Sequence, residues 1–107
     1  MKPEKVVFVD DELEKSFNSL NENDPIKKSL SRAIKNIQED AFCGRNVKKE
    51  LIPNKIIQKY SINNLWIYNL PDGWRMLYAL TSSGNIELIA AVLDWMNHKD
   101  YENLFNF

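Results

Sequence analysis

The feature that most constrains the fold is a turn between two apolar runs, in the segment NLWIYNLPDGWRMLYALT at residues 64–81. Asp72-Gly73 lies between these runs. An Asp-Gly pair in that position is the strongest short-range signal for a β-hairpin, because its tight turn needs the positive φ angles that these residues tolerate. We therefore expect two antiparallel strands, residues 64–70 and 74–81, joined at this turn.

The register of this hairpin decides which side chains share a face. If Asp72 and Gly73 form a two-residue loop, Leu70 faces Arg75, and alternation puts Arg75 on the same face as Trp66 and Tyr68. The other face carries a longer apolar row, which we expect helices to cover: Leu65, Ile67, Asn69, Trp74, Met76, Tyr78 and Leu80. A slip of one residue would exchange the faces.

A short strand and a helix are expected at the N-terminus. The run KVVFV at residues 5–9 is apolar and β-branched, which is typical of a buried strand. Asp10 or Asp11 can cap a following helix that reaches about Leu20, with an apolar stripe at helical spacing.

A second helix is the clearest element of the chain. Asp24 is a good N-cap, and Pro25 suits the first helical position. Apolar residues recur with helical periodicity as far as Ala41, and Gly44 is a natural stop. The opposite face carries four basic residues and one acid: Lys27, Lys28, Arg32, Lys35 and Glu39.

The rest of the chain alternates short elements. Residues 54–60 are expected to form a single helical turn, and residues 82–85 (SSGN) a second tight turn. Residues 86–93 (IELIAAVL) then form a strand, and residues 94–105 have the spacing of an amphipathic helix.

These elements predict an α+β fold in one domain, residues 1–107. Three strands joined by tight turns form an antiparallel meander, and the first strand joins it because a lone strand cannot bury itself. The expectation is a small, mostly antiparallel four-stranded sheet with an N-terminal helical hairpin on one face and a short C-terminal helix.

Composition excludes several classes of protein. Apolar residues make up 44% and charged residues 27%, which is typical of a folded globular chain. No apolar run approaches the ~18 residues of a membrane span, and residues 1–15 do not form a secretory signal. Cys43 has no partner for a disulfide and is expected to be buried. The chain has one cysteine and one histidine, so no metal site or cofactor is expected. We expect a cytoplasmic location.

Charge is unevenly distributed. Residues 1–24 hold three lysines and seven acids, residues 25–60 hold nine basic residues and three acids, and residues 61–107 hold two basic residues and five acids. The basic middle third could contact a polyanion. It could equally be a solvated helix face, partly neutralised by an acidic first helix packed against it.

Two segments carry a family resemblance. The hairpin LPDGWRMLY and the closing DWMNHKDYENLF, together with the order of elements, resemble the RelE/ParE superfamily of bacterial and archaeal toxins. The resemblance covers essentially the whole chain. It implies a RelE-like toxin that cleaves mRNA on the ribosome without a metal ion and that a cognate antitoxin protein neutralises.

The resemblance also implies catalytic residues. Arg75 matches the family's arginine after the central turn, which stabilises charge on the phosphate. Tyr101 matches the C-terminal tyrosine and His98 lies near it, which implies proton transfer and base stacking. Histidine titrates near neutral pH when nothing perturbs it, and this chain has one histidine. Structural roles stay open: Arg75 could pair with Asp94 or Glu87, and His98 could serve only its helix end.

The expected RNA-binding residues are Lys48, Lys49, Trp66, Tyr68 and Lys99. RelE-like enzymes place two lysines on the strand before the turn, where this chain has Trp66 and Tyr68. They also carry an arginine ahead of the terminal tyrosine, and LDWMN has none. The missing cations could come from the three lysines or from Arg45.

Two other functions remain open. A RelE-fold protein that does not cleave could bind an antitoxin-like partner through an apolar surface. A ParE-like member would instead inhibit gyrase. A metabolic enzyme is the weakest expectation, because the chain has no phosphate loop, metal cluster or nucleophile motif.

Overall fold

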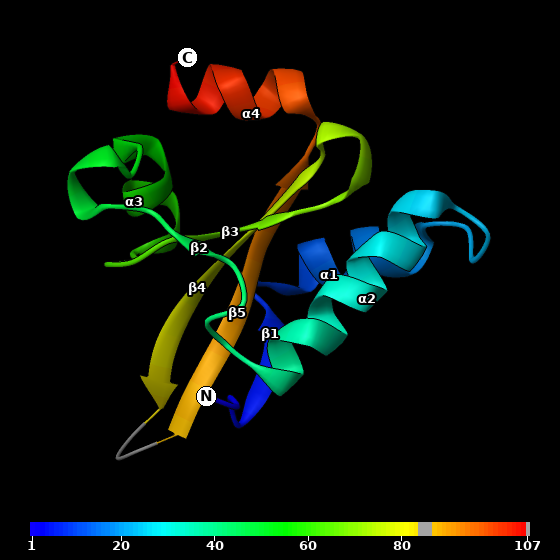
Figure 1. Cartoon of the computed structure of the whole chain (residues 1–107), viewed down its shortest axis with the longest axis horizontal. Coiled ribbons are helices and arrows are strands. Elements are labelled where there is room, and N and C mark those ends of the chain that lie inside the picture. Colours follow the sequence, from blue (N-terminus) through cyan, green and yellow to red (C-terminus); the bar gives the residue numbers. More distant parts are fainter. Residues whose placement is uncertain (84–86, 107) are drawn as a thin grey trace.

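The computed structural model describes residues 1–83 and 87–106, and over these residues the sheet has five strands in the order β1-β5-β4-β3-β2 (Figure 1). The strands are β1 (Lys5–Phe8), β2 (Arg45–Asn46), β3 (Trp66–Asn69), β4 (Arg75–Ser83) and β5 (Glu87–Met96). The helices are α1 (Asp11–Ser19), α2 (Pro25–Glu39), α3 (Asn54–Tyr60) and α4 (His98–Phe105), with short 3₁₀ turns η1 (Lys49–Leu51) and η2 (Pro71–Gly73).

The α+β class is confirmed, but the expected four-stranded sheet is wrong in one strand. β1 joins the sheet as expected and runs parallel to β5, while the other neighbours are antiparallel. The additional strand is β2, which pairs Arg45 with Ile67 and Asn46 with Trp66. Two exposed polar residues carry no alternation of polar and apolar side chains, so the sequence gives no signal for this strand.

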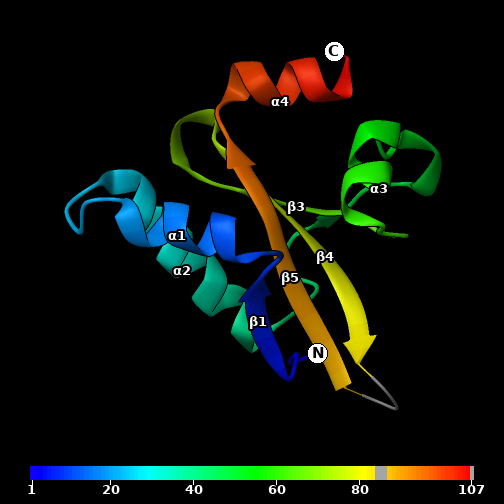
Figure 2. The same cartoon turned by 180° about the vertical axis from the view of Figure 1, so that it is seen from behind.

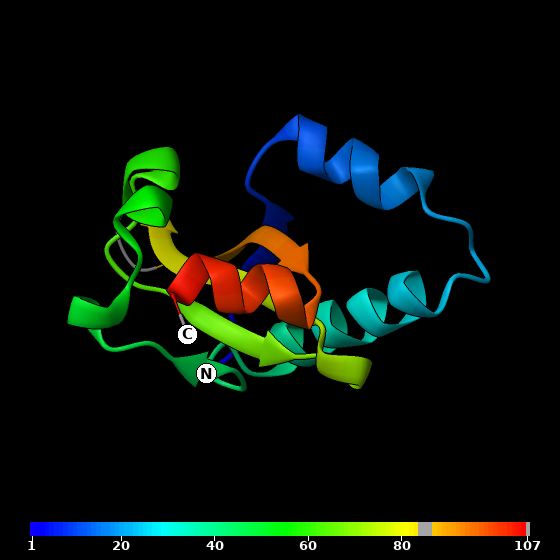
Figure 3. The same cartoon turned by 90° about the horizontal axis from the view of Figure 1, so that it is seen from above.

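The two N-terminal helices cover one face of the sheet (Figure 3). Their predicted caps are confirmed: Asp10 accepts a hydrogen bond of 2.8 Å from the Leu13 N–H, and Asp24 accepts one of 2.9 Å from the Ile26 N–H. The apolar stripes of α1 and α2 pack with Met76, Tyr78, Ala90 and Val92 of the sheet.

The end of α2 differs from the expectation. The helix stops at Glu39, short of Ala41, and Gly44 is not its C-cap. Ala41 donates its N–H to the Met1 carbonyl, and its own carbonyl accepts a bond from the Tyr78 hydroxyl. These two bonds turn the chain toward the sheet before another helical turn can form.

Helices α3 and α4 lie on the other face of the sheet (Figure 2). They pack Ile56 and Tyr101 against the strand residues Ile67, Leu77 and Leu93. The helical turn expected at residues 54–60 is confirmed as α3. Helix α4 begins only at His98, because residues 94–96 extend β5 and Asn97 caps the helix through the Asp100 N–H.

The predicted hairpin register is wrong by one residue. Asn69 pairs with Arg75 and Tyr68 with Met76. The loop holds three residues, because the Leu70 N–H bonds to the Trp74 carbonyl at 2.8 Å around the η2 turn. Asp72 and Gly73 do take the expected positive φ angles of 60° and 80°.

The longer loop exchanges the faces of β3 but leaves those of β4 as predicted. Trp66 and Tyr68 pack with the α1–α2 cluster, whereas Ile67 and Leu77 belong to the cluster under α3 and α4. Arg75 therefore does not share a face with Trp66 and Tyr68, because alternate residues of a strand point to opposite sides.

The turn expected at residues 82–85 falls partly outside the described residues. Over the part of the chain that is described, no helix combines the length and the apolar character needed to cross a membrane.

Candidate functional site

Arg75 begins β4 directly after the η2 turn and is half-buried against α4. Its guanidinium carbon lies 5.0 Å from the centroid of the Tyr101 ring, a cation–π distance. Nη1 donates a hydrogen bond of 3.2 Å to the Trp74 carbonyl. The buried Nε has no hydrogen-bond partner among the described residues. The Arg75 guanidinium is thus held in place with an unused donor.

Arg45 contacts the same tyrosine at its hydroxyl. Its Nη2 donates a hydrogen bond of 2.8 Å to the Tyr101 hydroxyl, across 56 residues of chain. Tyr101 is only 4% exposed, with one guanidinium on its ring and another on its hydroxyl. We call Arg45, Arg75 and Tyr101 the arginine clamp. From the sequence, Arg45 was predicted only as a possible substitute for the missing cations. Its contact with Tyr101 depends on strand β2, which the sequence did not predict.

His98 lies next to the clamp, in the first turn of α4. Its Cβ approaches the η2 turn so closely that a Cβ added to Gly73 would lie 3.0 Å from it. His98 Nε2 lies 3.0 Å from Glu102 Oε1, one helical turn further on. Glu102 was not predicted as a site residue, although its i, i+4 spacing from His98 is a usable signal in the sequence. The three predicted catalytic residues therefore gather around α4 and the hairpin turn.

The predicted RNA-binding residues lie in three separate places. Lys48, Lys49 and Lys99 are exposed, the first two just after β2 and the third in the first turn of α4.

Trp66 and Tyr68 lie on the far face of the sheet, away from the clamp. Trp66 stacks on Phe42 with ring centroids 5.4 Å apart, and the Tyr68 hydroxyl accepts a hydrogen bond from Asn36. Neither residue can flank Arg75 as the two-residue loop predicted.

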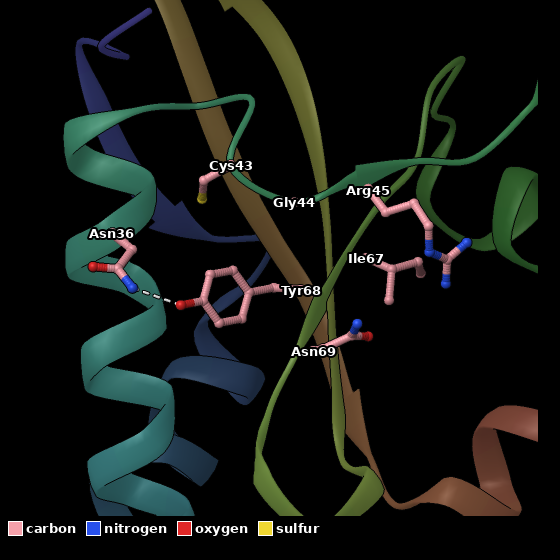
Figure 4. Close-up of a pocket in the computed structure, with 7 residues that line it drawn as sticks. All are labelled: Asn36, Cys43, Gly44, Arg45, Ile67, Tyr68 and Asn69. Atoms are coloured by element: carbon pink, nitrogen blue, oxygen red, sulfur yellow. Dashed lines mark hydrogen bonds between the residues drawn. The ribbon is translucent and has the colours of Figure 1, made fainter.

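A pocket of about 420 Å³ lies at the edge of the sheet, where β2 begins (Figure 4). We call it the edge pocket; its lining residues are Asn36, Cys43, Gly44, Arg45, Ile67, Tyr68 and Asn69. Cys43 was expected to be buried and is exposed, because the chain leaves α2 before reaching it. Arg45 belongs both to this pocket and to the clamp.

Metal ligands are not clustered in the described ranges: no group of three or more His, Cys, Asp or Glu side chains there could hold a metal ion.

No protein-family model, no curated protein and no solved structure matches this chain. The resemblance to the RelE/ParE superfamily therefore rests on the sequence alone, that is, on the hairpin, the closing segment and the expected order of elements.

Proposed function

We propose that this protein is the toxin of a type II toxin–antitoxin pair, an endoribonuclease that cleaves mRNA on the ribosome without a metal ion. The observation that carries the proposal is the convergence of Arg45 and Arg75 on Tyr101, beside the His98–Glu102 pair. This convergence places two fixed positive charges next to a group that can transfer protons.

The reaction suits these groups. In RNA cleavage a base removes the proton of the 2′-hydroxyl, O2′ attacks phosphorus, and O5′ leaves with a proton from an acid, giving a 2′,3′-cyclic phosphate and a 5′-hydroxyl. Positive hydrogen-bond donors stabilise the charge that develops on the phosphate oxygens. The Nε of Arg75 is buried and has no partner among the described residues, so a phosphate oxygen would satisfy this donor once the side chain turns toward it.

Each residue then has a distinct role. His98 is the exposed acid–base group, and Glu102 orients its ring from one turn away. Tyr101 is a positioning residue, because its small exposure and its two arginine contacts suit it to hold guanidiniums. The exposed Lys48, Lys49 and Lys99 contact backbone phosphates on either side.

A second candidate function is binding without cleavage. It is favoured by the place of Trp66 and Tyr68, which stand where RelE-like enzymes carry lysines and which lie on the face away from Arg75. The two arginines of the clamp would then only bind an anion, either an RNA phosphate or a carboxylate of an antitoxin segment, and would catalyse no reaction.

The test is inducible expression in a bacterium, followed by mapping of mRNA 5′ ends. We expect growth arrest with mRNA cut inside codons and bearing 5′-hydroxyl ends. Arg75→Ala should lower cleavage by about 10²–10³-fold, as loss of a transition-state donor does, and His98→Ala should also relieve the arrest. Lys35→Ala, an exposed charge on α2, is the matched control and should remain toxic.

Harmless wild-type expression with uncut mRNA on purified ribosomes would exclude the nuclease. Stable co-purification with a small partner in that case would favour the binding function. A DNA-damage response with intact mRNA would instead indicate gyrase as the target.

A further inference from the structure

We propose that the edge pocket binds a nucleobase, and that this base belongs to a nucleotide whose phosphate lies at the arginine clamp. The proposal rests on the proposed function for its choice of RNA as the ligand, and it names residues that the resemblance does not assign. The pocket residues that would contact the base are Asn36, Tyr68 and Asn69.

The open edge of β3 supplies the first part of the site. β2 pairs only with Trp66 and Ile67, and one more bond joins the Val47 N–H to the Leu65 carbonyl at 2.9 Å. Backbone groups of alternate residues point to the same neighbouring strand. Asn69 therefore directs its N–H and C=O toward the β2 side. β2 does not reach as far as Asn69, because it begins only at Arg45, opposite Ile67. A ligand at this edge meets a backbone donor and a backbone acceptor.

Side chains supply the second part. Asn36 of α2 points across the pocket to Tyr68, and its Nδ2 donates to the Tyr68 hydroxyl (Figure 4). That bond leaves the Tyr68 O–H as a donor toward the pocket, while the Asn36 carbonyl oxygen, also an acceptor, points away from Tyr68 (Figure 4). Every nucleobase presents adjacent donors and acceptors on its edge. The half-buried ring of Tyr68 adds an aromatic surface, on which bases stack irrespective of sequence.

Arg45 connects the pocket to the clamp. Its side chain lines the pocket, and its guanidinium is the one that bonds to the Tyr101 hydroxyl. The seven lining residues include this one cation and no acid, so the pocket suits an anionic ligand. Tyr68 and Arg45 point to opposite sides of β3 (Figure 4), so the nucleotide would pass around the open edge of this strand, with its base between α2 and β3 and its phosphate at Arg45.

The test is an NMR titration of the full chain with the four ribonucleoside 5′-monophosphates, with ribose 5-phosphate as the ligand that has the phosphate but no base. We expect at least one nucleotide to bind about fivefold or more tightly than ribose 5-phosphate, the factor that corresponds to ~1 kcal/mol of base stacking. Its signal changes should include the Asn36 side-chain amide and the Asn69 backbone amide.

Variants separate the base from the phosphate. Asn36→Ala and Tyr68→Leu should weaken nucleotide binding and leave ribose 5-phosphate unchanged, whereas Gln38→Ala, an exposed residue on the same helix, should alter neither. If Tyr68→Leu fails to fold, Tyr68→Phe is the second variant, because it keeps the ring. Its affinity for nucleotides should fall only by the contribution of the hydroxyl.

Equal affinity for nucleotides and ribose 5-phosphate would overturn the proposal, as would nucleotide binding that leaves the pocket signals unchanged, or no binding at all. These outcomes are distinct from those of the cleavage assay. Nucleotides that bind in the pocket of a protein that cuts no RNA would refute the nuclease and leave the base site standing. The opposite outcome is RNA cleavage whose rate and sequence preference Asn36→Ala leaves unchanged, together with no mononucleotide binding. That outcome would refute the base site and leave the nuclease standing.

Discussion

Arg75 lies over the ring of Tyr101, with its guanidinium carbon 5.0 Å from the ring centroid. This contact joins the first residue of β4 to the inner face of α4, the helix that also carries His98. Helix α4 has eight residues, too few to be stable alone, so its position depends on such tertiary contacts. The proposed phosphate site and the anchoring of α4 thus share one pair of side chains.

The first prediction concerns the coupling within this pair. In a double-mutant cycle of Arg75→Met and Tyr101→Leu, we expect an interaction free energy of about 1 kcal/mol, measured by urea unfolding, because the contact is partly shielded from water. Lys59 and Tyr60 give the matched control, since Lys59 lies 5.2 Å from the Tyr60 ring but is exposed. Their coupling should be smaller. Additive effects for Arg75 and Tyr101 would show that the contact contributes nothing to stability.

A second prediction concerns the hydroxyl of Tyr78, a residue with no exposed surface. It donates to the Ala41 carbonyl at 2.8 Å and accepts from the Gly44 N–H at 2.9 Å. Tyr78→Phe leaves both backbone groups without this partner and should lower the free energy of unfolding by about 1–3 kcal/mol. Tyr68→Phe removes a hydroxyl with a single exposed partner and should cost less. Equal losses for the two variants would contradict this account.

The same hydroxyl should titrate far above the usual range for tyrosine. Burial raises the pKa of Tyr78, because the charged phenolate would lose its hydration there.

Much of the fold follows from local signals in the sequence. Asp10 and Asp24 cap the two helices, and apolar periodicity defines their inner faces, because capping and amphipathicity involve neighbours in the chain. The hairpin was also predictable, since Asp72 and Gly73 supply the positive φ angles. Its register was not, because Leu70 and Trp74 extend the loop through a bond that no residue type specifies.

The site was predictable only in part for the same reason. Arg75, His98 and Tyr101 lie on elements whose existence the sequence indicated, and the structure brings them together. Arg45 depends on a two-residue strand and on a contact 56 residues away, so only tertiary structure assigns it to the clamp. The edge pocket likewise exists because β2 is short.

A third prediction concerns Gly44, which lets the chain pass close to the sheet before β2. A Cβ added there would lie 2.7 Å from the Tyr78 hydroxyl oxygen and 2.9 Å from the Ile67 carbonyl oxygen. The second atom belongs to the backbone of β3 and cannot easily move. Gly44→Ala should therefore destabilise the fold by about 1–3 kcal/mol, as overpacking does.

The same substitution should displace Arg45 from the clamp and weaken RNA binding in a fluorescence anisotropy titration. Asn46→Ala, at the other exposed residue of β2, is the control and should stay within about 0.5 kcal/mol of the wild type. If Gly44→Ala bound RNA as tightly as the wild type, Arg45 would not need its present position.

The last prediction concerns pH. Asp94 on β5 is half-buried, and burial is the main cause that raises the pKa of its carboxyl above the ordinary 3.8, although the Trp95 N–H bond and Lys59 oppose the rise. A raised pKa means that the folded protein binds this proton more tightly than the unfolded chain does. The ionised carboxylate therefore destabilises the fold at neutral pH, and this effect disappears as pH falls below 3.8.

Asp94→Asn should accordingly raise the free energy of unfolding at pH 7 and lose that advantage at pH 3, in urea titrations across this range. The asparagine oxygen can still accept the 2.8 Å bond from the Trp95 N–H, so the comparison isolates the charge. Asp72→Asn, in the exposed turn, is the control for the substitution itself, since asparagine tolerates the φ of 60° there. A variant less stable than the wild type at pH 7 would mean that attraction between Asp94 and Lys59 outweighs the burial.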